Sequence, residues 1–401
     1  MTPANVFASP ARQRMAILVA SGGLWLLVEA AFNVIGPLWA TRDLGLDNAG
    51  WAYLRSAAEL GGFVSALGFG ILSARIGTRR MSALTLAGAG VTLGALSLLG
   101  NAWLMAVLLM TLLGAFISAT YVNFNVLTQR VSLRRQSLAN SLYRAAGASA
   151  AIAGPALATQ LAHAADGYRP VLMGAAVLLG IAGLLILRFA EPPEEARART
   201  LREVLAGYRQ AFTLQPLLAL IAVSRAFGIA IAAVSAFAAL RFTRELHMSE
   251  TAFGALCSMI AIGNLCAVLC AGWLVDRLRP SRALAVAWLG CGLAAIVMGI
   301  SDSVVAVTVA YALFVPIQAT CSVPLSIWSS RVAREGAAQG PGDAAAFTIG
   351  KVFQSGTTML VMALLGVLEP VLGMSTLMWC GGLLGMPLAL IVLRMGAARG
   401  I

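Results

Sequence analysis

The sequence is short of charge, and two of the three basic residue types are almost missing. Only 11% of its 401 residues are charged, whereas about 25% is typical of a soluble domain. There is one lysine, Lys351, and there are two histidines, His163 and His247, which both fall at helix ends or in loops. We therefore expect neither an ordinary soluble domain nor a buried histidine relay.

The sequence also lacks the patterns of redox, metal and nucleotide chemistry. Its six cysteines all fall inside apolar segments, so neither disulfides nor a metal site are expected. No nucleotide-binding motif is present, so ATP is not the expected energy source. Apart from two glutamates, no constellation of catalytic residues predicts an enzyme, and no cofactor is expected.

The chain instead consists largely of long hydrophobic segments. Hydrophobic residues make up 60% of it, and the mean hydropathy is +0.86. Apolar runs of about 20 residues are long enough to cross a membrane as helices. A membrane barrel is not expected, because its strands alternate apolar and polar residues in short segments. The first run is expected to be a retained helix and not a signal peptide. The twelve expected spans are 15–40, 51–72, 81–100, 103–128, 137–161, 171–188, 217–240, 251–275, 283–300, 304–328, 344–368 and 371–393.

The basic residues are unevenly distributed over the loops. Of the 28 Lys and Arg residues, 20 fall in loops on the side of the N-terminus, four in the opposite loops and four inside helices. By the positive-inside rule, both termini are expected in the cytoplasm. The net charge of +12 is then a topology signal, and no nucleic acid is expected as a partner. The Ala- and Arg-rich composition is typical of a GC-rich bacterium, so the expected location is its cytoplasmic (inner) membrane.

A short basic loop occurs twice, half a chain apart. Residues 70–80 read "GILSARIGTRR" and residues 272–282 read "GWLVDRLRPSR", with Gly, Leu, Arg and Arg at the same four places. The first copy joins the second and third spans, and the other joins the eighth and ninth. A charged connection over 191–215 separates the two sets of six spans. We therefore expect an internal duplication of six plus six helices.

This organisation resembles the major facilitator superfamily (MFS) of secondary transporters. The resemblance covers essentially the whole chain and rests on the two six-helix halves, the charged central loop and the duplicated basic loop. It implies an all-α membrane protein with two six-helix bundles related by pseudo-two-fold symmetry. The expected domains are an N-terminal bundle over 1–190, a cytoplasmic central loop over 191–215 and a C-terminal bundle over 216–401.

The basic loop matches the loop motif of the family in part. In the family this loop braces the two halves in one of the access states. Ala74 stands where the family usually has an acid, and Arg279 replaces the second glycine of the motif, so a weaker brace is expected in the first copy. Alternatively, the arginines serve topology alone, or bind helix C-termini and anionic lipid headgroups. The matching residues are Gly70, Arg75, Gly77, Arg79 and Arg80 in the first copy, and Asp276 and Arg277 in the second.

Two positions bear on drug export. Gly154-Pro155 in the fifth span is similar to the core of a motif that drug-exporting members carry there, although such a step is also a common helix kink. Drug–proton antiporters usually have an arginine four residues before a glycine in the fourth span, and here Met110 precedes Gly114. The first feature favours export, and the second argues against a standard drug–proton antiporter.

Six ionisable residues lie inside the predicted spans, where charge is costly and marks functional candidates. The third, sixth, ninth and twelfth spans have none in their interiors. In the resembled fold these four helices lie outermost, so the placement of charge supports that fold independently. The six residues are Glu29, Arg55, Glu59, Arg144, Arg225 and Lys351.

The two glutamates are the candidates for proton coupling. Glu29 shares a helical face with Trp25 and Asn33, and an apolar setting lets a carboxyl exchange protons near neutral pH. The alternative for Glu29 is a structural ion pair with an arginine of the cavity. Glu59 lies one turn after Arg55, so it either takes part in transport or forms an ion pair with this neighbour.

Three cations are the candidates for holding a substrate. Arg144 and Arg225 offer a fork suited to carboxylate or phosphate, and Lys351 heads a polar stripe that faces a cavity or another helix. Alternatively, the arginines neutralise the glutamates or reach the inner interface, and the polar residues make interhelical hydrogen bonds. The predicted substrate-binding residues are Asn33, Tyr121, Asn125, Arg144, Arg225, Gln318, Lys351 and Gln354.

Four intramembrane cations against two acids predict an anionic small-molecule substrate. We expect a proton-coupled secondary transporter that moves an organic anion or amphiphile, such as a carboxylate-rich siderophore, by alternating access. The proton gradient is the expected energy source, a monomer is the expected state, and membrane lipid is the other expected partner. Import and export both fit. The alternatives are a multidrug exporter that works by proton antiport, and a lipid flippase-like or sensor protein of the same family.

Overall fold

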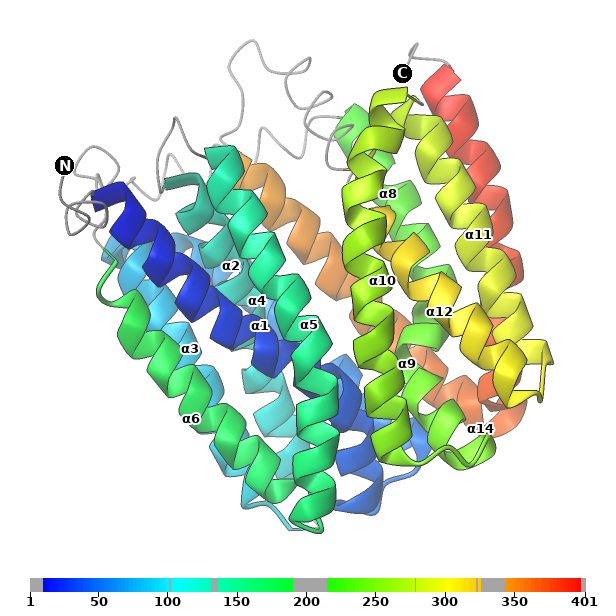
Figure 1. The fold of residues 1–401 in the computed structure, drawn as a ribbon, viewed down its shortest axis with the longest axis horizontal. Helices are drawn as coiled ribbons and strands as arrows, with labels where there is room; N and C mark the ends of the chain where they lie inside the picture. The colour runs from blue at the N-terminus through cyan, green and yellow to red at the C-terminus, as the bar shows by residue number, and fades with distance from the viewer. Residues whose placement is uncertain are drawn as a thin grey trace, which may run out of the picture.

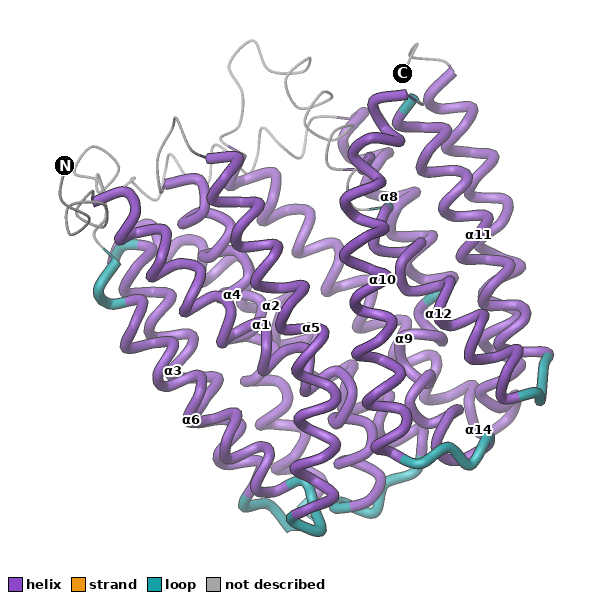
Figure 2. The backbone as a smooth tube through the Cα atoms, in the orientation of Figure 1, coloured by secondary structure: helices purple, strands orange, loops and turns teal. Residues whose placement is uncertain are grey.

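The computed structural model describes residues 10–100, 102–130, 136–189, 215–277, 279–321, 324–325 and 343–397. In these ranges the chain forms helices joined by short loops, and it has no β-strand. Figure 1 shows α1 to α6 gathered in one bundle and α8 to α14 in a second, with the start of α1 and the end of α14 on the same side. We call this the terminal side, and the opposite side, where most of the described loops lie, the far side (Figure 2).

The first bundle contains six long helices, and local signals explain where two of them meet. The Asp47 side chain accepts a hydrogen bond of 2.7 Å from the Gly50 N–H and so caps the start of α2. Gly77 has a φ of 89°, which lets the chain turn sharply from α2 into α3. The helices are α1 (Pro10–Arg42), α2 (Asn48–Ile76), α3 (Thr78–Ser97), α4 (Trp103–Arg130), α5 (Gln136–Ala164) and α6 (Arg169–Ile186).

The second bundle departs from the expected spans in α8 and α9. The expected helix 217–240 is interrupted at Ile231 and continues into a π-helical turn. Within the expected span 304–328, α12 ends at Thr320, residues 324 and 325 are again helical, and residues 322–323 and 326–328 lie outside the described residues. The last two expected spans form α14, in which the chain reverses at Gly373 with a φ of 76°. The elements are α8 (Gln215–Ala230), α9 (Ala232–Leu240), η3 (Arg241–Glu245), α10 (Glu250–Arg277), α11 (Pro280–Ile300), α12 (Val304–Thr320) and α14 (Asp343–Ala397).

Seven of the described helical segments are long and apolar enough to cross a membrane. One of them, Gly350–Ala397, has 48 residues and covers most of the last two expected spans. The expected spans on α2, α3 and α5 are not among these seven segments. The expected central loop lies almost entirely outside the described residues, and the domain boundaries placed there stay a prediction.

Glycine brings two helices of the first bundle into backbone contact. A methyl group on Gly114 of α4 would lie 1.7 Å from the carbonyl oxygen of Ala58 on α2. A methyl group on Gly61 of α2 would lie 1.8 Å from the carbonyl oxygen of Thr111 on α4. Both distances are far below any van der Waals contact, so only glycine permits this approach. It positions the charged residues of α2 against α4.

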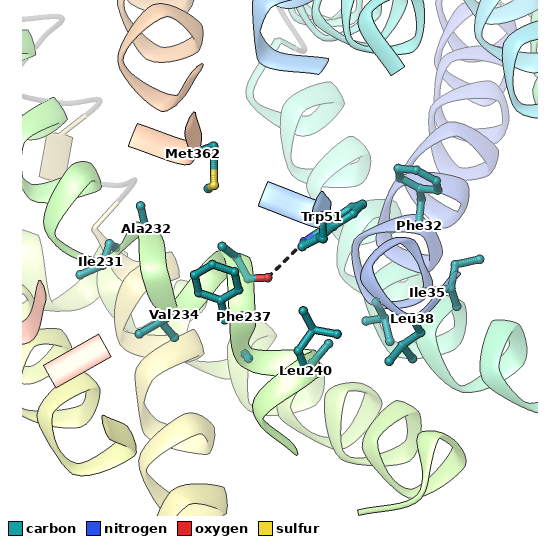
Figure 3. Close-up of a cluster of buried hydrophobic side chains, with 14 of the residues drawn as sticks. Phe32, Ile35, Leu38, Trp51, Ile231, Ala232, Val234, Phe237, Leu240 and Met362 are labelled. Atoms are coloured by element: carbon teal, nitrogen blue, oxygen red, sulfur yellow. Dashed lines mark hydrogen bonds between the residues drawn. The ribbon is translucent and has the colours of Figure 1, made fainter. Parts of the chain in front are cut away.

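The two bundles meet along α2 with α14 and along α5 with α10. On the far side their contact is a buried apolar cluster, to which α1 and α2 contribute Phe32 and Trp51 and α9 contributes Phe237 (Figure 3). The Trp51 indole Nε1 donates a hydrogen bond of 3.2 Å to the carbonyl oxygen of Ala236 on α9. Aromatic burial and this hydrogen bond hold the two bundles together on the far side.

Candidate functional site

Arg55 and Glu59 form an ion pair within α2. Arg55 Nη2 lies 3.6 Å from Glu59 Oε1, one helical turn away. The two side chains are 32% and 16% exposed, so water screens this pair less than a surface pair. The neighbour pairing that the sequence allowed is therefore present, and each charge partly compensates the other.

Glu29 lines a small cavity inside the first bundle, with a volume of about 40 Å³ open to water-sized molecules. Its neighbours on the same face of α1, Trp25 and Asn33, line it too, and Arg55 of α2 adds a charge. The glutamate therefore has few polar partners. Aliphatic side chains of α3, α4 and α6 line the other walls: Leu93, Leu113, Ile117 and Leu179.

Lys351 belongs to the second bundle and contacts the first. Its Nζ lies 5.7 Å from the centroid of the Tyr121 ring on α4, which is within the range of a cation–π interaction. Acidic and basic groups of both bundles lie within its electrostatic range. These charged neighbours are Glu29, Arg55, Glu59 and Arg225.

Arg225 on α8 completes this central cluster. It lies within electrostatic range of both Tyr121 and Lys351. Its buried Nε makes no hydrogen bond in the described part of the chain. The structure thus brings together five predicted site residues from five helices, with a guanidinium that is not fully satisfied. They are Glu29, Glu59, Tyr121, Arg225 and Lys351.

The other predicted binding residues are less closely engaged. Asn125 and Gln318 are half-buried and Gln354 is exposed, and none of these side chains bonds to another described residue. Arg144 lies in α5, but its side chain is outside the described residues. Asn123, another polar residue of α4, is buried, and its side-chain oxygen accepts a hydrogen bond of 3.1 Å from the Ser73 hydroxyl of α2.

One member of the polar stripe of α14 lies in a contact between the bundles and not on a cavity wall. Ser355 is fully buried, and a methyl group on Gly62 of α2 would lie 3.0 Å from its Oγ. Nearby, the Ser56 hydroxyl donates a hydrogen bond of 2.9 Å to the carbonyl oxygen of Met359. The stripe therefore serves two purposes, because Lys351 reaches the central cluster while Ser355 packs against α2.

The first basic loop attaches α3 to the end of α6. Arg79 Nη1 donates a hydrogen bond of 3.3 Å to the carbonyl oxygen of Phe189, which follows the last turn of α6. Arginine at a helix C-terminus satisfies an unpaired carbonyl and complements the helix dipole. Arg75 and Arg80 are exposed, as is Arg277 in the second copy. The side chain of Asp276 lies outside the described residues, so the bracing role stays a prediction.

Gly154 and Pro155 lie where α5 meets both α1 and α10. A methyl group on Gly154 would lie 2.9 Å from the carbonyl oxygen of Leu27 on α1. The next residue, Ala156, donates its backbone N–H to the Ser258 hydroxyl of α10 at 3.2 Å. This Gly-Pro step therefore lies in the seam between the two bundles.

The comparison with known families decides what this arrangement is. The sequence profile of the Major Facilitator Superfamily matches residues 18–350. This chain belongs to the major facilitator superfamily. It is accordingly a multi-pass membrane protein and a secondary transporter of small molecules, and it is not an enzyme. No curated protein sequence matches the chain.

Solved MFS structures share the fold over nearly the whole length. A variant of the nucleoside transporter NupG aligns with a TM-score of 0.77 and 13% identity, covering 95% of this chain and 99% of NupG. The xylose transporter XylE from E. coli, in a partially occluded inward-open conformation, aligns with 0.73 and 12%, covering 96% and 99%. A POT family transporter in complex with a thioalcohol-conjugated peptide gives 0.75 and 12%, covering 96% of each chain. At these identities the likeness shows the fold alone.

Polar contacts on the far side of this MFS transporter join its two bundles, and the sequence did not single them out. Asn48 at the start of α2 accepts a hydrogen bond from Arg244 and donates one to Glu369, both at 2.9 Å. Arg244 and Glu369 belong to the second bundle. Short polar loop residues of this kind look like ordinary solvated loops in a sequence, so only the fold reveals that Asn48 bridges the bundles.

A second far-side contact centres on Glu250 at the start of α10. Its Oε2 accepts a hydrogen bond of 2.5 Å from the Tyr168 hydroxyl and lies 3.5 Å from Arg42 Nη1. Tyr168 and Arg42 belong to the first bundle. Burial and the hydrogen bond to Glu250 raise the pKa of the Tyr168 phenol, so the hydroxyl remains a donor at physiological pH. Together with the Asn48 bridge, this contact joins the two bundles on the far side.

Proposed function

We propose that this transporter carries an organic anion together with a proton. The central cluster, with the neighbouring Arg55, contains more positive than negative groups. The cations are Arg55, Arg225 and Lys351, and the acids are Glu29 and Glu59. Arg55 pairs with Glu59, and both acids lie within electrostatic range of Lys351. The Nε of Arg225 has no hydrogen-bond partner among the described residues. That guanidinium is the observation that carries the proposal, because a buried cation is costly until an anion or hydrogen bonds complete it.

Lys351 would couple the proton to the anion. Its ammonium has acidic neighbours in the protein, and a bound carboxylate would compete with them for it. Protonation of Glu29 removes one of these competitors, so Lys351 can join Arg225 in holding the substrate. Because the anion then binds best when the proton is bound, both travel in the same direction. The proton gradient would therefore supply the energy by symport.

The far-side contacts support an alternating-access cycle. Access from the far side requires the Asn48 and Glu250 contacts to open, while the cluster stays near mid-membrane between the bundles. The excess of arginine in the loops of the terminal side supports its placement in the cytoplasm of a bacterium. The far side would then face outward, and transport of the anion would require it to open.

The test is proton flux in proteoliposomes that contain a pH-sensitive dye. The purified protein is challenged from outside with a panel of carboxylate anions and a panel of cationic drugs. We expect a carboxylate to acidify the lumen, and we expect Glu29→Gln and Lys351→Met each to abolish this signal. Arg188→Gln, at an exposed position after α6, is the matched control and should transport normally.

The opposite outcome has a definite meaning. If only cationic drugs move protons, and Glu29→Gln behaves as the wild type, the anion proposal is wrong. Drug export by proton antiport then takes its place, as the Gly154-Pro155 step favours. If carboxylates move without protons, the substrate class stands and the coupling does not.

A further inference from the structure

The indole of Trp25 is buried with an unsatisfied donor. Trp25 is 1% exposed, and its Nε1 has no hydrogen-bond partner among the described residues. A buried N–H group that has lost water without gaining a partner is costly, and such groups are rare in folded proteins. Trp51 avoids this cost, because its indole Nε1 donates to the backbone carbonyl of Ala236.

Trp25 lines the same cavity as Glu29, which follows it by one helical turn. Asn33, one turn further, lines this cavity as well. A volume of about 40 Å³ exceeds the roughly 10–15 Å³ that one water molecule needs, and such a water is stable when it has at least two polar partners. Three residues with polar side-chain groups, Trp25, Glu29 and Asn33, line this cavity from one face of α1.

We propose that a water molecule bound in this cavity links the Trp25 Nε1–H to the Glu29 carboxyl, and that Trp25 is a positioning residue for the proton site. An indole nitrogen only donates, so the water must accept this hydrogen bond with its oxygen. The two hydrogens of the water can then be donated to acceptors. Glu29, with its carboxylate, and Asn33, with its amide oxygen, line the same cavity. The inference rests on the proposed function only in taking Glu29 as the coupling group.

The direction of the effect follows from this orientation. A water that donates to Glu29 favours its ionised form over its protonated form. The other charged groups facing Glu29 are Lys351 and Arg55, with Glu59 beyond them. The walls from α3, α4 and α6 are aliphatic and add no titratable group. Trp25 therefore acts on the proton through the water and without touching the substrate.

Infrared difference spectroscopy during a pH titration tests this in the full-length protein. Recorded in H₂¹⁶O and H₂¹⁸O, the wild type should show an isotope-sensitive water band that changes together with the Glu29 carboxyl band. In Trp25→Phe the water band should disappear, and the midpoint of the Glu29 titration should rise by about one pH unit, a tenfold change in proton affinity. Trp39→Phe is the matched control, because Trp39 is equally buried on α1 and does not line the cavity.

A second variant covers the case in which Trp25→Phe does not fold. Leu179→Phe fills the cavity from α6 without altering any polar group, and it should remove the same water band. The inference is wrong if the band survives in either variant, or if Trp39→Phe removes it equally. These spectra report on the water whether or not transport is coupled to protons, so they separate this inference from the flux experiment on Glu29→Gln.

Discussion

At the scale of single residues, the missing side chains of Gly61 and Gly114 set the distance between α2 and α4. The two glycines lie on facing helices, and each leaves room for a carbonyl oxygen of the other helix. This close approach fixes where Arg55 and Glu59 lie relative to Tyr121 of α4. A methyl group here would act on the central cluster through the backbone.

We predict that Gly114→Ala destabilises the protein by about 1–3 kcal/mol, as overpacking in a core usually does. The added carbon would lie 1.7 Å from the Ala58 carbonyl oxygen, so α2 and α4 must separate. Thermal unfolding of the detergent-solubilised protein measures the effect. Gly180→Ala on α6 is the control, since nothing lies within 4 Å of its added carbon. Equal melting temperatures for both variants would contradict the close contact.

The sequence locates the charged residues of the cluster but not their partners. A glutamate or lysine within an apolar run stands out, so Glu29, Glu59 and Lys351 are predicted from the sequence. The i, i+4 pair of Arg55 and Glu59 follows from helical spacing, and the structure confirms it. The approach of Lys351 to Tyr121 joins two halves of the chain, and no local pattern encodes it.

At the scale of elements, Arg79 ties the start of α3 to the end of α6. The hydrogen bond to the Phe189 carbonyl replaces a bond that a helix C-terminus cannot make within itself. The sequence predicted that arginines of this loop bind helix C-termini, as one of several alternatives. Helix boundaries were predicted less well: the helix is interrupted at Ile231, and the π-helical turn Arg241–Glu245 contains the buried Arg241, which donates a hydrogen bond of 2.9 Å to the carbonyl oxygen of Ser301.

We predict that Arg79→Ala lowers the free energy of unfolding by about 1 kcal/mol, the usual worth of one such hydrogen bond. Arg80→Ala, one residue further and exposed, should leave it unchanged within about 0.5 kcal/mol. Chemical denaturation in detergent, followed by circular dichroism, compares the two. A loss of stability in Arg80→Ala that matches Arg79→Ala would show that charge, and not the contact with α6, is responsible.

At the scale of the whole molecule, Asn48 bridges the bundles because an amide both donates and accepts. Asn48→Asp removes the donor and places a carboxylate opposite Glu369, so we expect the far side to open more often. Loss of this half-buried contact with a charged group, worth about 1–3 kcal/mol, shifts the balance of access states at least fivefold. Distances between spin labels on the far-side loops measure the populations of the two states.

A second substitution provides the control for this bridge. Glu369→Gln restores a donor opposite the new carboxylate, so Asn48→Asp combined with Glu369→Gln should return the populations towards the wild type. Arg244 still finds an acceptor at position 48 in the double variant. Additive effects of the two substitutions would show that this hydrogen bond does not hold the far side closed.

The ion pair within α2 has a consequence for how the protein is made. Arg55 and Glu59 lie one turn apart on α2. When this helix inserts into the membrane during biosynthesis, each of the two charges therefore already has its partner within the same helix. Glu29 and Lys351 lie on α1 and α14, near opposite ends of the chain, and neither has an opposite charge three or four residues away in its own helix. The central cluster is therefore assembled only after the ribosome has passed residue 351. In a nascent chain that stalls before that point, Glu29 of the first bundle lacks the interaction with Lys351.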